Sequence, residues 1–128
     1  MFEQATTFGG ISVDDLDAAR RFYGETLGLG IREAMGGITV ELPGGTHLWV
    51  YPKADHRPAT FTVLNFSVPD IDAAVDALIA AGVTMAVYPG MHQDERGIAR
   101  GRSVQHGPDI AWFTDPAGNI LSVLQEDD

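Results

Sequence analysis

The period of the hydrophobic pattern changes in the same order in each half of the chain. Apolar and polar residues alternate over 6–13 and 61–68, which favours a short strand in each place. A stripe with helical spacing follows each strand. In the second half it comprises Ile71, Ala74, Val75, Leu78 and Ile79, and in the first half Leu16, Ala19, Phe22, Tyr23 and Leu27. The pattern therefore predicts a strand and then a helix, twice.

Residues that favour helix ends lie on either side of these stripes. Asp14-Asp15 and Pro69-Asp70 precede the two stripes, and an aspartate at that position can accept hydrogen bonds from the free N–H groups of the first helical turn. Gly82 follows the second stripe and can end that helix in a left-handed conformation. Three shorter strands are predicted after each helix, at 30–34, 37–42 and 46–51, and at 83–88, 109–114 and 119–124.

An internal repeat links the two halves. SVDDLDAA at 12–19 returns as SVPDIDAA at 67–74, with six of eight residues identical, and GTHLW at 45–49 is echoed by GNILS at 118–122. We therefore predict an α+β fold of two tandem βαβββ modules within a single domain, 1–128. The modules run over about 5–52 and 60–126, joined by a polar linker at 52–60. Their strands are expected to form a curved, incompletely closed mixed sheet around a cleft.

Strand alternation also indicates which side chains lie away from the helices. That face mixes aromatic rings with polar groups, which is typical of a small-molecule pocket, although aromatic residues are also common in dimer interfaces. Both interpretations stay open, and one cleft can serve both. The candidate ligand-binding residues are Phe8, Ser12, His47, Trp49, Tyr51, Asn65, Ser67, Trp112 and Ser122.

Composition narrows the class of partner. The chain has 128 residues, 45% hydrophobic and 20% charged, which is ordinary for a soluble globular protein. Its net charge of −10 argues against nucleic acid or an anionic membrane as a partner, because phosphate groups would be repelled. No cysteine, secretory leader or long apolar run is present, and we expect a cytoplasmic protein.

The segment 89–108 is the insertion that distinguishes the second half. It holds Arg96, Arg100 and Arg102, whose guanidinium groups could bind an anionic ligand if the segment acted as a lid, with Arg96 the candidate contact. Asp94 and Glu95, with His47 on the sheet face, are candidate proton acceptors. The alternative is a solvated loop whose arginines neutralise nearby acids.

The motifs resemble those of the vicinal oxygen chelate superfamily, which holds glyoxalases, extradiol dioxygenases and bleomycin-resistance proteins. The resemblance rests on the paired repeat, on Arg21-Phe22-Tyr23 with Leu27-Gly28-Leu29, and on WFTDPAGN at 112–119. It covers residues 6–125 and implies a fold of paired modules. We also expect a homodimer, because the aromatic sheet face can serve as a dimer interface. In metal-dependent members, the first and last strand of each module supply four ligands to a divalent ion.

In this sequence those four positions fall on Phe8, Trp49, Val63 and Ser122. Phenylalanine, valine and tryptophan offer no lone pair to a cation, so we expect no metal cofactor. The prediction is a metal-free small-molecule-binding protein. The alternatives are a lyase-like or isomerase-like enzyme related to glyoxalases, and a non-catalytic dimerising protein.

Overall fold

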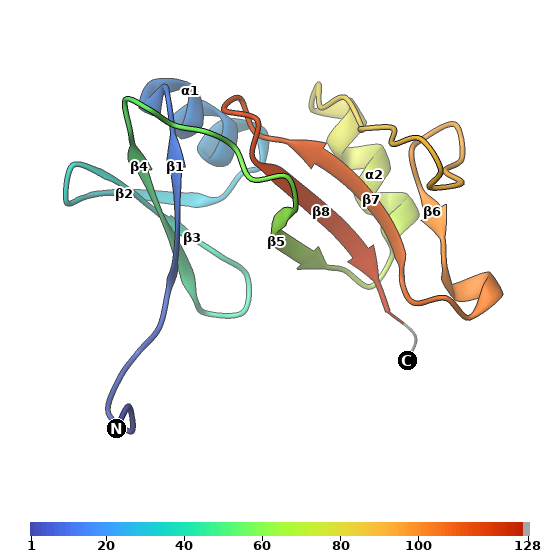
Figure 1. Cartoon of the computed structure of the whole chain (residues 1–128), viewed down its shortest axis with the longest axis horizontal. Helices are drawn as coiled ribbons and strands as arrows, with labels where there is room; N and C mark the ends of the chain where they lie inside the picture. Colours follow the sequence, from blue (N-terminus) through green and yellow to red (C-terminus); the bar gives the residue numbers. More distant parts are fainter. Residues whose placement is uncertain (127–128) are drawn as a thin grey trace. The chain divides into compact units, whose positions relative to one another are not determined.

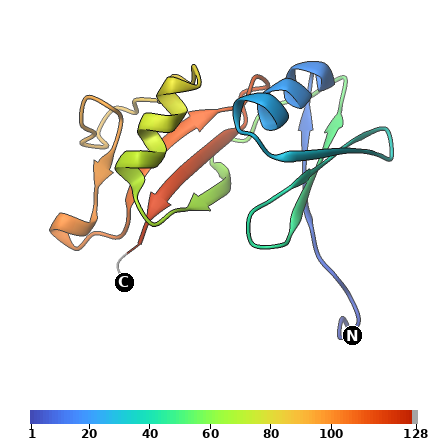
Figure 2. The same cartoon turned by 180° about the vertical axis from the view of Figure 1, so that it is seen from behind.

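The computed structural model describes residues 1–126, which form two compact units, 1–58 and Ala59 onward. Each unit contains one four-stranded sheet with its helix against one face (Figure 1). Seen from behind, α2 of the second unit lies over β8 and β7 of its own sheet (Figure 2). No helix within residues 1–126 is long and apolar enough to span a membrane.

The first unit contains β1 (Gly9–Val13), α1 (Leu16–Arg21), β2 (Gly30–Ala34), β3 (Gly37–Glu41) and β4 (His47–Pro52). The strand order is β1-β4-β3-β2, with β1 parallel to β4 and the other pairs antiparallel. The predicted first helix is only partly α-helical, because the chain changes to a π-helical turn at Phe22–Thr26. That turn still brings Tyr23 into the core, where it is fully buried.

The second unit repeats this topology with β5 (Thr62–Ser67), α2 (Ile71–Ala80), β6 (Ala99–Arg100), β7 (Asp109–Thr114) and β8 (Ile120–Gln125). A 3₁₀ turn covers Arg102–Val104. The order β5-β8-β7-β6 again contains one parallel pair, β5 with β8. The predicted α+β class and the two-module architecture are confirmed as two mixed four-stranded sheets, neither closed into a barrel.

The predicted helix ends are confirmed in atomic detail. Asp15 accepts a hydrogen bond from the Ala18 N–H at 3.1 Å, and Asp70 accepts one from the Ala73 N–H at 3.2 Å. Gly82 ends α2 with φ of +94°, a conformation that costs glycine little. The repeated aspartate is therefore a capping residue in both modules.

The strand predicted at 83–88 is wrong. This segment makes one backbone hydrogen bond to β7, from the Ala86 N–H to the Trp112 carbonyl at 2.8 Å. The side chain of Gln93 then bonds the Tyr88 N–H and the Ala86 carbonyl, groups that a regular ladder would use. The edge position in the sheet is held instead by β6, which pairs with Asp109 and Ile110 of β7.

Each unit has its own core between helix and sheet. In the second unit Ile71 and Val75 of α2 pack with Ile98, Ala111 and Val123. In the first unit the fully or almost fully buried residues are Val13, Ala19, Tyr23, Ile38, Val40, Leu48 and Val50. On the strands, these core residues alternate with the predicted site residues, so the opposite face of each sheet carries the candidate site.

Candidate functional site

On the first sheet, the face away from α1 is built around Trp49. Trp49 lies opposite Gly10 of β1 and Thr39 of β3, and Tyr51 lies opposite Ser12. Directly opposed residues share a face of the sheet. The structure therefore brings together four of the five residues that sequence alternation had placed there, Ser12, His47, Trp49 and Tyr51, and the fifth, Phe8, stacks on His47.

The Trp49 indole lies across the neighbouring strand. Its Nε1–H donates to the Ala34 carbonyl at the end of β2, 3.1 Å away, so the ring spans β3. A Cβ at Gly37 would lie 3.1 Å from this nitrogen, and the glycine leaves that space open. Tyr51 stacks on the indole, with ring centroids 4.5 Å apart and planes inclined by 24°.

A second aromatic pair lies beside the first along β4. The rings of Phe8 and His47 stack at 4.8 Å, and Phe8 is 49% exposed. Within the described part of the chain, the His47 imidazole makes no hydrogen bond, so no hydrogen-bonding side chain orients it as a proton acceptor. His56 belongs to the linker between the modules, and its Nδ1 lies 2.6 Å from the Ser12 hydroxyl.

The second sheet also carries a tryptophan, Trp112, but on β7 and not on β8, the counterpart of β4. Asn65, Ser122 and Trp112 form a row across β5, β8 and β7. The Trp112 Nε1–H donates to the Thr62 hydroxyl on β5 at 3.1 Å, so this indole spans β8. Tyr88 packs edge-on against it at 5.6 Å. Ser122 is completely buried and donates its hydroxyl hydrogen to Asn65 Oδ1 at 2.5 Å.

Sequence reasoning missed Thr62 because β5 is not regular. Thr62 pairs with Ile120 and Leu64 pairs with Leu121, which leaves Val63 without a partner in β8. Strict alternation placed Val63 on the outward face at this level, whereas the bulge brings Thr62 opposite Ile120. Ser67, by contrast, lies as predicted on the outward face, exposed and opposite Leu124.

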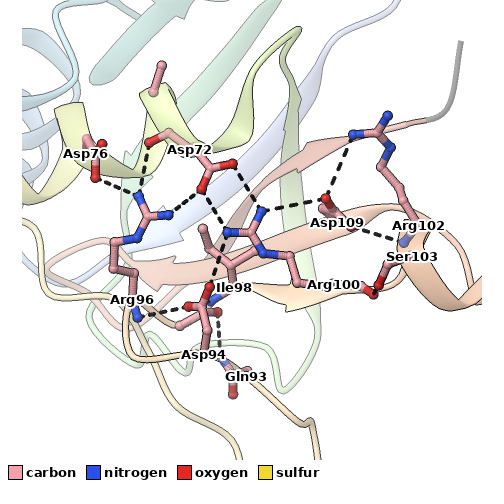
Figure 3. Close-up of polar contacts among 12 residues, drawn as sticks. Asp72, Asp76, Gln93, Asp94, Arg96, Ile98, Arg100, Arg102, Ser103 and Asp109 are labelled. Carbon is pink, nitrogen blue, oxygen red and sulfur yellow. Dashed lines mark hydrogen bonds and ion pairs between the residues drawn. The ribbon is translucent and has the colours of Figure 1, made fainter.

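Arg96 and Arg100 of the long loop pair with acids of α2, and Arg102 pairs with Asp109 of β7, an arrangement of the kind that the solvated-loop alternative describes (Figure 3). Arg96 pairs with Asp72 and, at 2.7 Å, with Asp76. Arg100 pairs with Asp72 at 2.8 Å and Asp94 at 3.2 Å. Ile98 packs with the α2 side of the sheet, so these groups lie on the side away from Ser122 and Trp112. The structure does not bring Arg96 to the candidate site.

Asp94 organises the loop instead of facing the sheet. Its carboxylate accepts hydrogen bonds from the Arg96 and Ile98 N–H groups, both at 2.9 Å, in addition to the Arg100 pair. Partial burial raises the pKa of Asp94 most, but the Ile98 and Arg96 N–H groups and the Arg100 charge together bring it below its ordinary value. A carboxylate held in this way is a weak proton acceptor. Glu95 is exposed on the same loop.

Asp72 is the centre of this network. Hydrogen bonds from Arg100 and then Arg96 hold the pKa of its carboxyl far below the usual range. The pKa values of both arginines are raised in return, that of Arg100 chiefly by Asp72 and that of Arg96 chiefly by Asp76. The network therefore fixes the inserted loop to α2 at neutral pH.

The four positions at which the family resemblance places metal ligands make other contacts here. Trp49 donates its only ring N–H to Ala34, Ser122 donates to Asn65, and Phe8 and Val63 are apolar. Across residues 1–126, no group of three or more His, Cys, Asp or Glu side chains could hold a metal ion.

Comparison with known proteins shows which family has this architecture. A family model described as "Glyoxalase/Bleomycin resistance protein/Dioxygenase superfamily" matches residues 5–123. No curated protein matches the sequence.

Three solved structures share the fold. TnmS3, an antibiotic-binding protein from Streptomyces sp. CB03234, is 22% identical with a TM-score of 0.70, and 99% of each chain is covered. A superfamily member from Sphaerobacter thermophilus is 23% identical, with a TM-score of 0.67 over 98% of this chain and 100% of that chain. A glyoxalase/dioxygenase from Nostoc punctiforme is 18% identical, with a TM-score of 0.67 over 99% and 94%. At these identities the likeness shows the fold alone.

Proposed function

Because the chain belongs to the glyoxalase/bleomycin resistance protein/dioxygenase superfamily, we propose that it binds a small molecule on its sheet faces. The observation that carries this proposal is the tryptophan on each sheet. Trp49 and Trp112 both lie across a neighbouring strand, and each is tied down through Nε1. The hydrogen bond fixes the ring edge, and both side chains remain partly exposed. Such a ring is a stacking surface for a flat ligand.

Polar groups beside the rings support the same proposal. The first sheet offers His47 and Ser12 next to the stacked aromatics, and the second offers Asn65 and Ser67. Apolar walls with a few placed polar groups are typical of small-molecule sites. The likeness to TnmS3, which is an antibiotic-binding protein, agrees with this class of ligand.

We propose that binding needs no divalent ion. The support is the chemistry of the four positions where the family resemblance puts ligands: two apolar side chains, an indole N–H that can only donate, and a hydroxyl that donates to Asn65. None of these four side chains has a carboxylate or imidazole group, which are the groups that bind Mn²⁺, Ni²⁺, Zn²⁺ or Fe²⁺. Elemental analysis of the purified protein should therefore find far less than one such ion per chain.

Thermal unfolding in the presence of antibiotics tests the proposal. Bleomycin, daunorubicin and ciprofloxacin, each with EDTA present, are the probes, and unfolding is followed by circular dichroism. At least one should raise Tm, because binding to the native state stabilises it by mass action. The rise should shrink in Trp49→Ala or Trp112→Ala, provided that the variant keeps the native spectrum.

Other outcomes would contradict it. An unchanged Tm with all three probes argues against a ligand site of this kind. Turnover of the methylglyoxal–glutathione adduct that stops on adding a chelator would instead establish the metal-dependent lyase alternative.

We also propose a cytoplasmic homodimer. The support is the superfamily resemblance and the half-exposed Phe8, together with the acidic composition. Sedimentation at the 13.7 kDa mass of one chain across micromolar concentrations would contradict the dimer.

A further inference from the structure

We propose that the Asn65 side chain is a fixed hydrogen-bond donor, and that the ligand of the second sheet is neutral, planar and bears an oxygen acceptor. Ketone, quinone and amide carbonyls belong to this class. The inference rests on the proposed function and names the chemistry of the molecule bound beside Trp112.

The orientation of the amide is set by Ser122, the residue that pairs with Asn65 on the neighbouring strand β8. Ser122 is completely buried and donates to Asn65 Oδ1, which fixes the amide oxygen toward β8. The Asn65 residue is exposed, and its Nδ2 group takes no part in this hydrogen bond. Within residues 1–126 this nitrogen has no hydrogen-bond partner. Its two N–H groups are therefore available to an acceptor, and their direction is already fixed.

The planar shape follows from the neighbouring indole. Trp112 starts on β7 and reaches Thr62 on β5, the strand that also carries Asn65. A flat ring system lying on this indole has one edge at β5. An oxygen on that edge can meet the Asn65 amide while the rings stack on Trp112.

The charge of the ligand follows from the surroundings. The residues that pair across β5, β8 and β7 on this face are Asn, Ser, Thr, Trp, Ile and Leu, all uncharged. Arg96 and Arg100 of the loop are bound to Asp72, Asp76 and Asp94 on the α2 side. Arg102 pairs with Asp109, which strand alternation places on the same side of the sheet as the core residue Ala111. Among the described residues of these three strands, a carboxylate would find no cation on this face, in a protein of net charge −10, whereas a carbonyl needs only the amide.

Selective labelling gives a direct test, because the chain has only two asparagines, Asn65 and Asn119. Asn119 is buried and donates to Asp115 in the β7–β8 turn, so it is an internal control. Protein labelled with ¹⁵N-asparagine is titrated with 9-fluorenone and with fluorene, which has the same rings but no carbonyl. We expect fluorenone to bind about five- to tenfold more tightly and to shift only the Asn65 amide signals.

Two variants separate the donor from the shape of the site. Asn65→Asp keeps the size of the side chain and can still accept from Ser122, but it replaces the N–H donors with oxygen, so the preference for fluorenone should disappear. Ser122→Ala leaves the amide but frees it to rotate, and the preference should fall below about threefold. Native circular dichroism spectra are required of both.

The outcomes also distinguish this inference from the proposed function. Equal affinity of the wild-type protein for fluorenone and fluorene would overturn the donor role while leaving a binding site at Trp112. Failure of both compounds to bind, when an antibiotic probe does bind, would overturn the ligand class alone. Failure of every compound would overturn both proposals.

Discussion

Gly37 is the residue on which the position of the Trp49 indole depends. A Cβ there would lie 2.3 Å from the Val50 carbonyl oxygen and 3.1 Å from Trp49 Nε1. The backbone oxygen cannot move without disturbing β4, so Gly37→Ala should destabilise the protein by about 1–3 kcal/mol. The expected result is a lower urea midpoint together with a change in tryptophan emission.

Gly10→Ala is the matched control, since Gly10 is also a strand glycine next to Trp49. Its Cβ would meet its nearest neighbours at 3.7–3.9 Å, which is ordinary contact. The free energy of unfolding should change by less than about 1 kcal/mol in either direction. An equal loss of unfolding free energy in the two variants would show that the close approach at Gly37 is not the cause of the destabilisation.

Single residues also explain why part of the site could be predicted. The faces of β1 and β4 followed from alternation, because both strands pair without interruption. Thr62 could not be found in this way, since the unpaired Val63 shifts the register and nothing in the local sequence marks a bulge. The contact between His56 and Ser12, 44 residues apart, depends on the path of the linker and not on any pattern.

At the scale of elements, the inserted loop is held to α2 by charge. Asp72 pairs with both Arg96 and Arg100, whereas Asp76 pairs with Arg96 only. Asp72→Asn should therefore speed amide hydrogen exchange over residues 93–102 more than Asp76→Asn does. Faster exchange in Asp76→Asn than in Asp72→Asn would contradict the central position of Asp72.

The same network predicts how the loop responds to pH. The pKa of Asp72 is lower in the folded protein than in the unfolded chain, so its stabilising contribution is complete above the ordinary value near 4 and is lost as pH falls through the folded value. Exchange over 93–102, corrected for its intrinsic pH dependence, should be constant between pH 5 and 8. It should begin to rise only in more acidic solution, and loosening near neutral pH would contradict this assignment.

Elements also show where local sequence and tertiary context disagree. The helix ends were predictable because Asp15, Asp70 and Gly82 act through the backbone next to them. The strand predicted at 83–88 failed because Gln93, on the following loop, takes the backbone groups of that segment. β6 has only two residues, too few to show any period in the sequence.

At the scale of the whole molecule, the two modules share one topology but carry different side chains at equivalent positions of their sheets. Trp49 and Ser122 occupy equivalent places, opposite Gly10 and Asn65 respectively. In the first module this strand position is occupied by the tryptophan whose ring lies on the sheet. In the second it holds a buried hydroxyl that orients an amide, and the ring comes from β7. The fold was readable from the repeat, whereas the divergence of the two faces lies in side-chain contacts that only the structure provides.

The central claim is that a small molecule stacks on these tryptophans without a metal. Since the chain has two tryptophans, Trp112→Phe leaves Trp49 as the only indole, and Trp49→Phe leaves Trp112. The most direct measurement is fluorescence of these two variants titrated with bleomycin, daunorubicin and ciprofloxacin in EDTA. We predict saturable quenching of at least one indole, at the concentrations that raise Tm. Binding that leaves both emissions unchanged, or that disappears in EDTA, would contradict the account.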